Sequence, residues 1–568
     1  MLPNFFVRFC AAVPLLSLLA SSCNAAPTAL PDTQTISTPH GDVTGAVIGS
    51  VRRFTVPFAA PPTGRRRFLK AMPVDKWTRY GPAQFSSLAQ SRSSGLGSLN
   101  GTQLPSKCFQ TNEQHPEGEG DEDCLYMNVY SRLGPSRPNG QRDPVLVWIH
   151  GGSFHSGGTS DLDAGIRSFV GERIVVVSLQ YRLGMLGWLK WGTRGFAGNQ
   201  GLTDVIEALK MIKSDISAYG GDPSSITIAG QSSGAELIKT LLVTPSAADL
   251  FERAILQSAP LDFVDQSAST ASAVGSMVGT EFGCAPRAVR YCVQRQSLDR
   301  IAQVQNIVLS PSQTLDLASA NLDFTAVEPF RPHVDGELVT RDFRQVIASG
   351  DQLENPSRPL LFSTVKNEGC NGVRKQLAQF PEPAWNQLAP GVLMALFPTR
   401  FGLIQSSGLY DLNAEGDDLR DELSQLTTDW NWVCPNQQTA LGSAAKSGYS
   451  GNVFLAEFDM GIPRYPEDSI LGCDRGVGHE DDIFAVFGSS LSANYSAAQK
   501  KLISEVQERW AAFVRRGSPN LNGIPEWPAV AASEGDLNVW VFGADSSKGT
   551  SAVRKTQRTE ACAAYTTA

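Results

Sequence analysis

Short apolar segments alternate with helix-like segments through the middle of the chain. Residues 144–149, 175–179 and 226–229 are largely apolar and rich in β-branched side chains, as is typical of strands buried on both faces of a sheet. Residues 199–216 lie between the second and third of these segments and have the amphipathic periodicity of a helix. Repetition of strand, helix and strand predicts an α/β fold in which helices cover both faces of a doubly wound, mostly parallel sheet.

The apolar pattern extends on both sides of this central part. Residues 35–58 alternate apolar and polar positions between Gly and Pro breaks, which predicts an N-terminal antiparallel hairpin. Further strands are predicted at residues 122–130, 251–257, 359–365 and 452–458. Residues 268–312 have a helical but irregular pattern, and we expect them to form an insertion above the sheet.

The strand predicted at residues 226–229 runs directly into Gly-Gln-Ser-Ser-Gly at 230–234, and helix-forming residues resume at Ala235. This order predicts a sharp turn between a strand and a helix, with Ser232 at its apex. Glycine is needed two positions before and two positions after the serine because the strained turn leaves no room for a Cβ atom there. The motif alone arises by chance in a chain with 52 glycines, but its place between strand and helix predicts that Ser232 is a nucleophile.

A serine nucleophile needs a general base, a carboxylate that orients the base, and hydrogen-bond donors for the oxyanion. The strand at residues 144–149 leads into His150-Gly151-Gly152-Ser153. Glycines directly after a buried strand leave backbone N–H groups unobstructed, so this turn is a candidate oxyanion hole. An ordinary Gly-rich turn is the alternative interpretation, and the motif alone does not choose between them.

The candidate base is His479, because it alone among six histidines follows both a candidate acid and a late predicted strand. The candidate acid is Glu368, which comes just after a predicted strand, at the end of a parallel sheet where ligands bind. The chain order Ser232, Glu368, His479 is that of a Ser-acid-His triad on a doubly wound sheet. Asp335 is the alternative acid, and we expect it to be structural. His155 follows the Gly-rich turn and is a candidate pocket residue.

Composition and charge exclude some functions without choosing a substrate. The chain has 568 residues, of which 42% are hydrophobic and 18% are charged. We find no linker, repeat or low-complexity tract, so residues 26–568 are predicted to form a single domain. A net charge of −8 argues against nucleic acid and an anionic membrane surface as partners. The predicted chemistry requires neither a metal nor a cofactor, and its expected partner is a small-molecule substrate.

Residues 1–25 are predicted to be a secretory signal peptide. Arg8 supplies a positive charge, residues 10–20 form an apolar stretch too short to span a bilayer, and small residues precede a cleavage site near Ala26. A bacterial lipoprotein acylated at Cys23 is the competing interpretation. Residues 554–568 are polar, so we expect a secreted, extracellular protein without a stable membrane anchor.

Removal of residues 1–25 takes away two of ten cysteines and leaves eight, an even number that favours disulfides in an exported protein. Cys108 with Cys124, and Cys284 with Cys292, are close in sequence and are predicted to close small loops. Spacing does not pair the other four, which are Cys370, Cys434, Cys473 and Cys562. Asn100 and Asn494 lie in Asn-X-Ser/Thr sequences and are candidate N-glycosylation sites in a eukaryotic host.

These motifs together resemble those of type-B carboxylesterases, the cholinesterase-like branch of the α/β-hydrolase family, and secreted fungal members more than animal ones. The resemblance covers most of the mature chain and includes residues 56–64, Arg67-Phe68, residues 122–130, His150-Gly151-Gly152, Asn199, Gly201-Leu202, Asp204, residues 220–223, residues 230–234, Glu368-Gly369, His479, Phe487-Gly488 and residues 517–520. It implies a serine ester hydrolase in which Ser232 is the nucleophile, His479 the base and Glu368 the orienting acid. The reaction would pass through an acyl-enzyme intermediate.

The same resemblance implies further structural roles. The backbone N–H groups of Gly152, Ser153 and Ser233 would form the oxyanion hole. Cys434 would pair with Cys562, and this leaves Cys370 and Cys473 to bridge the loops that carry the acid and the base. The resemblance implies neither a metal nor a cofactor.

Departures from the family pattern bear on the substrate and the site. Ser153 stands where relatives usually have a third glycine, and Gln231 stands where they often have a glutamate, which removes a buried charge beside the triad. The loop between Cys108 and Cys124 lacks the tryptophan with which cholinesterases hold a quaternary ammonium, so choline esters are not expected to be preferred. That loop is also short compared with the lids of fungal lipases, which favours an esterase acting on soluble substrates.

Two other functions stay open at the level of the sequence. An interfacial lipase of the same family would act on droplets or micelles. A non-catalytic binding or adhesion homologue is the alternative from another class of protein. Such homologues typically lose the nucleophile, whereas Ser232, Glu368 and His479 are all present in this chain.

Overall fold

The structure of the protein is a computed structural model. It describes residues 33–77, 98–112, 114–134, 140–192, 195–285, 289–310, 328–351, 353–354, 358–377, 390–391, 393–394, 396–397, 400–412, 419–446, 452–462, 477–488, 495–531, 537–556 and 558–566. The predicted signal peptide, Cys473 and Asn494 lie outside these described residues.

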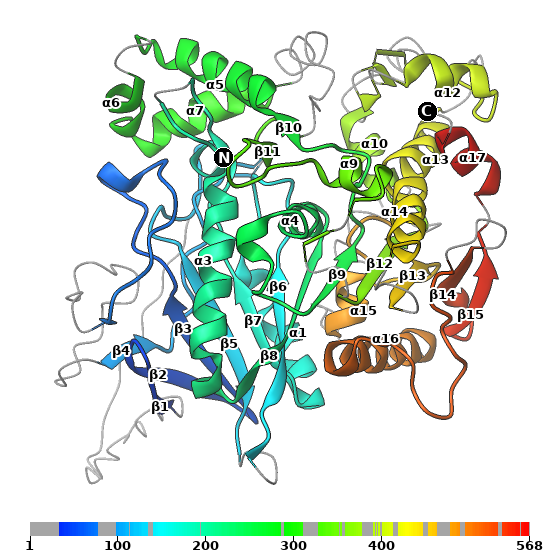
Figure 1. Cartoon of the computed structure of the whole chain (residues 1–568), viewed down its shortest axis with the longest axis horizontal. Helices are drawn as coiled ribbons and strands as arrows, with labels where there is room; N and C mark the ends of the chain where they lie inside the picture. The colour runs from blue at the N-terminus through cyan, green and yellow to red at the C-terminus, as the bar shows by residue number, and fades with distance from the viewer. Residues whose placement is uncertain are drawn as a thin grey trace, which may run out of the picture.

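A large mixed sheet runs through the molecule (Figure 1). In order across the sheet its strands are β1 (Thr33–Thr38), β2 (Gly41–Ile48), β3 (Val51–Pro57), β5 (Tyr126–Arg132), β7 (Val175–Leu179), β6 (Asp143–Ile149), β8 (Gly221–Gln231), β9 (Arg253–Gln257), β12 (Leu360–Val365), β13 (Val453–Phe458), β14 (Asn538–Asp545) and β15 (Thr550–Lys555), with β4 (Ser98–Gly101) beside β2. Neighbouring strands from β7 to β14 are parallel, and antiparallel pairs lie toward both edges. The predicted mostly parallel sheet is therefore confirmed.

The N-terminal segment forms more than the single hairpin that the sequence predicts. β1 pairs antiparallel with β2, and β3 turns back to pair antiparallel with β2. Gly49 makes this second turn with φ 62°, a left-handed conformation that glycine adopts without strain. β3 then continues the antiparallel pairing onto β5, so the hairpin becomes one edge of the central sheet.

Side chains of β6 alternate between two hydrophobic cores, one on each face of the sheet. Val145, Val147 and Ile149 belong to one core, and Leu146 and Trp148 belong to the other. Helices α3 (Gln200–Asp215) and α4 (Ser233–Leu241) contribute to the first core, and α1 (Asp163–Phe169), α15 (Ile483–Phe487) and α16 (Ala497–Arg516) contribute to the second. Burial on both faces explains why the central strands read as nearly continuous apolar runs.

The predicted helical insertion contains α5 (Ala268–Phe282), α6 (Val289–Gln294) and α7 (Leu298–Val308) (Figure 1). Ser267 caps α5 by accepting a hydrogen bond from the Thr270 N–H, and Ser297 caps α7 by accepting one from the Arg300 N–H. Gly283 ends α5 in a left-handed conformation with φ 66°. The helical stretch is thus divided at residues whose chemistry favours helix ends.

The C-terminal strands and the long helix before them were not predicted from the sequence. β14 lies parallel to β13, and β15 returns antiparallel to it. α16 begins at a capping box, in which Ser496 Oγ accepts from the Gln499 N–H and Gln499 Oε1 accepts from the Ser496 N–H. This Ser-x-x-Gln spacing is a recognisable helix start, so the sequence did hold a signal for α16.

The described residues also form several shorter elements. They are α2 (Gly184–Trp188), α9 (Phe343–Ala348), α10 (Cys370–Leu377), α12 (Phe401–Ser407), α13 (Arg420–Thr427), the π-helix η9 (Thr428–Val433), α14 (Cys434–Ala444), α17 (Thr559–Thr566) and the paired strands β10 (Gln266–Ser267) and β11 (His333–Val334). None of the helices in the described ranges is both long and apolar enough to cross a bilayer.

Disulfides join three pairs of described cysteines. The pairs are Cys108–Cys124, Cys284–Cys292 and Cys434–Cys562. The first two have the pairing that sequence spacing predicts, and the third has the pairing that the family resemblance implies. The bridge between Cys370 and Cys473 stays a prediction, because Cys473 lies outside the described residues.

Candidate active site

Ser232 occupies a sharp turn between β8 and α4. β8 ends at Gln231, α4 begins at Ser233, and Ser232 between them has φ 56° and ψ −128°. A positive φ is uncommon for a residue with a side chain, so the turn carries backbone strain that the surrounding structure must hold. The Ser232 N–H donates a hydrogen bond to the Gln257 carbonyl at 3.0 Å, which ties the turn to the neighbouring strand β9.

Glycine is required on both sides of this turn by close backbone contacts. A Cβ atom on Gly230 would lie 2.7 Å from the carbonyl group of Gly234. A Cβ atom on Gly234 would lie 2.3 Å from the Ile149 carbonyl oxygen and 2.7 Å from that of His150. The end of β6 therefore packs directly against the turn, and this contact explains the Gly-x-Ser-x-Gly spacing.

His479, whose side chain is 19% exposed, and the buried Glu368 form a pair on the loops beyond β13 and β12. His479 Nδ1 lies 2.5 Å from Glu368 Oε2, and Glu368 Oε1 accepts a hydrogen bond from the Val365 N–H at 2.8 Å. The two loops are joined by their backbones, since the Asn367 N–H donates to the Val477 carbonyl at 2.9 Å. His479 and Glu368 are 111 positions apart in the chain, and these bonds hold them together.

Acidic neighbours decide the protonation of His479. Glu368 accepts the Nδ1–H, which leaves the lone pair of the neutral imidazole on Nε2. Burial lowers the pKa of His479, but the charge and hydrogen bond of Glu368 and the charges of Glu480 and Asp482 outweigh burial. The pKa of His479 therefore lies above its ordinary value.

The second nitrogen of His479 faces the end of β8. Its Nε2 lies 3.1 Å from the Nε2 of Gln231, the residue directly before Ser232. Within the part of the chain that the structure describes, Ser232 Oγ makes no hydrogen bond, so the imidazole contacts this turn through Gln231. Contacts for proton transfer in active sites often tighten only in the complex with substrate.

The turn after β6 has the left-handed backbone that its Gly-rich sequence favours. Gly152 has φ 113°, and Ser153 and Phe154 have φ 50° and φ 60°. Ser153 thus adopts a glycine-like conformation although it carries a side chain. Among the described residues, the N–H groups of Gly152, Ser153 and Ser233 find no hydrogen-bond acceptor, so all three can donate to a ligand oxygen.

Buried aromatic rings support this Gly-rich turn. The Tyr181 hydroxyl donates to the His150 carbonyl at 2.9 Å, and the two rings stack with 4.5 Å between their centroids. Burial raises the pKa of Tyr181, so its hydroxyl stays a donor at any working pH. The Phe154 ring meets the Trp188 ring edge to face at 5.1 Å. His150 therefore has a structural place in this turn.

Three further residues lie near the pair of His479 and Glu368 and were not identified from the sequence: Gln257, Asp482 and Trp432. Gln257 Nε2 donates to Asp482 Oδ2 at 2.7 Å, and Trp510 Nε1 donates to Gln257 Oε1 at 3.2 Å. Burial raises the pKa of Asp482 to about 7. The Trp432 ring lies 5.5 Å from the His479 ring. The acidic stretch after His479 was a signal for Asp482, but nothing in the sequence marked the other two.

Asp335 and His155 have local backbone partners. Asp335 Oδ1 accepts hydrogen bonds from the N–H groups of residues 337–339 at 2.8 to 3.0 Å, and Oδ2 accepts one from Asn199 Nδ2 at 3.0 Å. These bonds close a turn, which agrees with the structural role expected of Asp335. His155 Nδ1 lies 3.0 Å from the Ser153 carbonyl oxygen, and its place in a substrate pocket stays a prediction.

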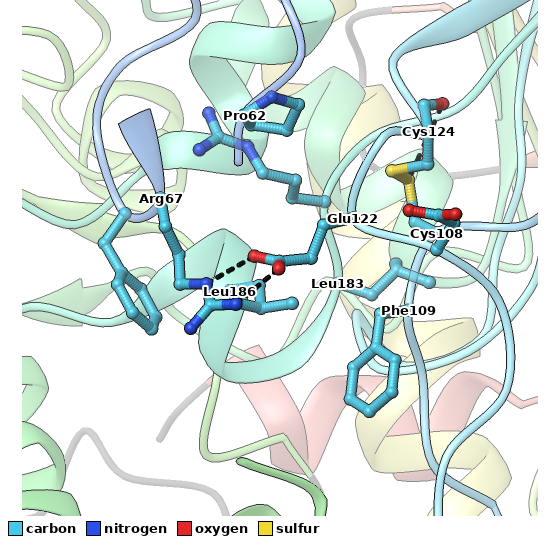
Figure 2. A pocket seen from close by; sticks show the side chains of 11 residues that line it. Pro62, Arg67, Cys108, Phe109, Glu122, Cys124, Leu183 and Leu186 are labelled. Carbon is cyan, nitrogen blue, oxygen red and sulfur yellow. Dashed lines mark hydrogen bonds and ion pairs between the residues drawn. A yellow bond between two sulfur atoms is a disulfide. The ribbon is translucent and has the colours of Figure 1, made fainter. Parts of the chain in front are cut away.

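A small cavity lies beside the Cys108–Cys124 disulfide (Figure 2). Arg67 and Glu122 form an ion pair in its wall, with 2.5 Å between Arg67 Nε and Glu122 Oε1. The cavity has a volume of about 10 Å³, roughly enough for one water molecule. None of the predicted catalytic residues lines it, so we assign it no part in binding an ester. The described ranges also contain no group of three or more His, Cys, Asp or Glu placed to hold a metal ion.

The strained serine between β8 and α4, with a histidine and its carboxylate on loops beyond nearby parallel strands, places the molecule among the α/β-hydrolases. The profile of the Carboxylesterase family matches residues 32–564, and the chain belongs to this family. It is a carboxylic ester hydrolase of the serine esterase class.

Individual relatives span nearly the whole chain. Carboxylesterase 1E of Mus musculus is 28% identical and covers 93% of this chain and 93% of the relative. Liver carboxylesterase of Sus scrofa is 29% identical and covers 86% of this chain and 84% of the relative. The solved structure of PNB esterase matches with a TM-score of 0.72 at 23% identity, over 94% of this chain and 99% of that one. This last likeness shows the fold.

Proposed function

We propose that the protein hydrolyses soluble carboxylic esters with a triad of Ser232, His479 and Glu368, through an acyl-enzyme intermediate. The contact of 2.5 Å between His479 Nδ1 and Glu368 Oε2 carries this proposal, because it prepares a neutral imidazole with its lone pair on Nε2. The approach of that nitrogen to Gln231, next to Ser232, supports the same roles. Membership of the Carboxylesterase family supports an ester as the substrate.

In the first half of the reaction, Ser232 Oγ attacks the ester carbonyl carbon while His479 Nε2 takes the hydroxyl proton. The oxyanion that forms accepts hydrogen bonds from the backbone N–H groups of Gly152 and Ser153, and from that of Ser233 at the start of α4. The intermediate then collapses, the bond to the alcohol oxygen breaks, and the alcohol leaves with the proton from His479. The Glu368 carboxylate stabilises the imidazolium between the two proton transfers.

In the second half of the reaction, water replaces the alcohol. His479 Nε2 takes a proton from the water as its oxygen attacks the acyl carbon bonded to Ser232 Oγ. The second oxyanion collapses, the bond to Ser232 Oγ breaks, and the serine regains its proton from His479. The carboxylic acid leaves, and the enzyme returns to its starting state.

We also propose that residues 1–25 are removed and that residues 26–568 form a single secreted domain. The disulfides between described cysteines support folding in an oxidising compartment. Asn100 lies in β4, where its Oδ1 accepts from the Thr102 N–H at 3.2 Å and from the Thr102 hydroxyl at 2.8 Å. We propose Asn100 and Asn494 as glycosylation sites.

The role of Ser232 is tested by Ser232→Ala, with Ser224→Ala as a matched control at an exposed position of the same strand. Ser232→Ala should stay folded and lower kcat/KM by at least about 10³-fold, while Ser224→Ala keeps normal activity. A phosphonate ester should label Ser232 of the wild-type protein and leave the alanine variant unlabelled. Normal turnover by folded Ser232→Ala would refute the triad.

The preference for soluble esters rests on the short loop closed by Cys108 and Cys124, which are 16 positions apart. It is tested by measuring hydrolysis of a short-chain ester below and above the concentration at which that ester forms micelles. A soluble-substrate esterase should show a smooth saturation curve through this point. A steep rise in rate above it would identify an interfacial lipase.

A further inference from the structure

The side chain of Gln231, the residue directly before the proposed nucleophile, contacts the proposed base. It belongs to the last residue of β8 and is fully buried. Its Nε2 lies 3.1 Å from His479 Nε2. Its Oε1 makes no hydrogen bond to a described residue and packs against Gly151, where an added Cβ atom would lie 2.9 Å from it. The amide therefore lies with its nitrogen toward the imidazole.

The tautomer of His479 determines which groups can bond to its Nε2. Because Glu368 Oε2 accepts the Nδ1–H, Nε2 of the neutral ring carries a lone pair and needs a donor. The amide nitrogen of Gln231 is such a donor. A carboxylate in the same position only accepts hydrogen bonds, so it could bond to Nε2 only after His479 is protonated.

We propose that Gln231 is a positioning residue that donates a hydrogen bond to Nε2 of neutral His479 and so keeps the base unprotonated and oriented before substrate arrives. This proposal rests on the proposed function, because it takes His479 to be the base for Ser232. On substrate attack the lone pair of Nε2 must pass from the amide to the Ser232 hydroxyl. Gln231 thus acts on the reaction through the base and not through the ester.

Acidic groups face His479 from its other sides. Glu368 reaches it from the loop after β12, and Glu480 and Asp482 lie on its own loop. Burial lowers the pKa of His479, and the charges of these three groups raise it. The uncharged Trp432 ring faces the imidazole from η9 at 5.5 Å. The amide at the end of β8 therefore favours the neutral imidazole in surroundings that otherwise favour the imidazolium.

Substitutions at position 231 should raise the pKa of His479 by amounts that follow a fixed order. Methionine keeps the volume and removes the donor, so the neutral ring loses a hydrogen bond and the pKa of His479 should rise by about half to one unit. Glutamate adds a negative charge within hydrogen-bond distance, and the pKa should rise by about one to three units. A rotated glutamine could offer its oxygen to the imidazolium, but a neutral amide attracts that ion far less than a carboxylate does.

The experiment measures the acid limb of the pH profile of kcat/KM for p-nitrophenyl acetate, which reports the base of the free enzyme. The rate of phosphonate labelling at Ser232 is followed over the same pH range. The proteins are the wild type, Gln231→Met, Gln231→Glu and the control Gln437→Met. Gln437 is also a buried glutamine whose Nε2 donates one hydrogen bond, to Thr556 Oγ1 at 2.7 Å, but it lies on α14.

We expect the acid limb to shift to higher pH for Gln231→Met and to still higher pH for Gln231→Glu. It should not shift for Gln437→Met. If the acid limb of Gln231→Met stays at the wild-type pH or moves to lower pH, the inference is overturned, even if Gln231→Glu fails to fold. A merely structural role would lower stability or kcat without moving the limb. If the phosphonate did not label Ser232 in the wild type, the proposed function itself would fail. If Ser232 is labelled but the acid limb of kcat/KM lies at the same pH in all the variants at position 231, only the inference is refuted.

Discussion

Glu368 is held between two hydrogen-bond donors, and its replacement by glutamine should disable the base while keeping the side-chain volume. Its Oε1 accepts from the Val365 N–H at 2.8 Å, and its Oε2 accepts from His479 Nδ1 at 2.5 Å. Glutamine offers one acceptor oxygen and one NH₂ group that only donates. Because the Val365 N–H is fixed in the backbone of β12, the oxygen should face it and the NH₂ group should face His479.

That arrangement selects the wrong tautomer of His479. Nδ1 must then carry the lone pair and Nε2 the proton, so the ring cannot accept the proton of Ser232. Selection of the wrong tautomer in the well-studied Ser-His-Asp proteases lowers kcat by about 10⁴-fold. We expect Glu368→Gln to lower kcat by about 10²- to 10⁴-fold, which corresponds to roughly 3 to 5 kcal/mol in activation free energy. KM should change little, because the Glu368 side chain is buried behind the imidazole.

The assay is steady-state hydrolysis of a short-chain ester, with circular dichroism and thermal unfolding to confirm that each variant is folded. Asp335→Asn is the control, because Asp335 closes a turn by accepting three backbone N–H groups. It should lower the melting temperature and leave kcat near normal. A near-normal kcat in Glu368→Gln, together with loss of activity in folded Asp335→Asn, would show that Asp335 and not Glu368 orients His479.

The remaining predictions concern stability. Burial raises the pKa of Asp482 from 3.8 to about 7, so the folded state binds this proton more tightly than the unfolded state, and stability should fall as the pH rises from about 4 to about 7. Asp482→Asn should flatten the fall of the melting temperature over this window, and an unchanged slope would contradict this account. Gly234→Ala places a Cβ atom 2.3 Å from the Ile149 carbonyl oxygen, so it should cost about 2 to 4 kcal/mol of stability and lower kcat. Gly372→Ala, where a Cβ atom meets nothing within 4 Å, should do neither, and equal melting temperatures for the two variants would refute the packing argument.

Local patterns in the sequence were sufficient for the central strands and for the turn at Ser232. Strands buried on both faces leave continuous apolar runs, and the contact between β6 and the turn requires Gly230 and Gly234, so both features are visible along the chain. His479 and Glu368 were proposed from the order of residues along the chain, which indicates topology but gives no distances. The same reasoning could not show that the two loops meet or that they are joined through Asn367.

Contacts between distant segments are what the sequence could not supply. The approach of Gln231 to His479 joins residues 248 positions apart, and the bond from Gln257 to Asp482 joins residues 225 positions apart. The family resemblance placed Gln231 beside the triad, but nothing in the sequence showed that its amide would face the imidazole. The C-terminal strands escaped prediction because their burial depends on packing against β13 and α16.

The backbone bond between the acid and base loops bears on how such an enzyme diversifies. The Asn367 N–H and the Val477 carbonyl fix the spacing of Glu368 and His479 where the two strands end, whatever the length of chain that runs between them. The helical part of the intervening segment before β13, which includes α10, α12, α13 and α14, can therefore be lengthened, trimmed or exchanged by recombination without resetting the proposed proton relay. Selectivity and turnover become separately evolvable properties, and a chimera that grafts this segment from a relative should change which esters are accepted while it keeps the intrinsic reactivity of the serine.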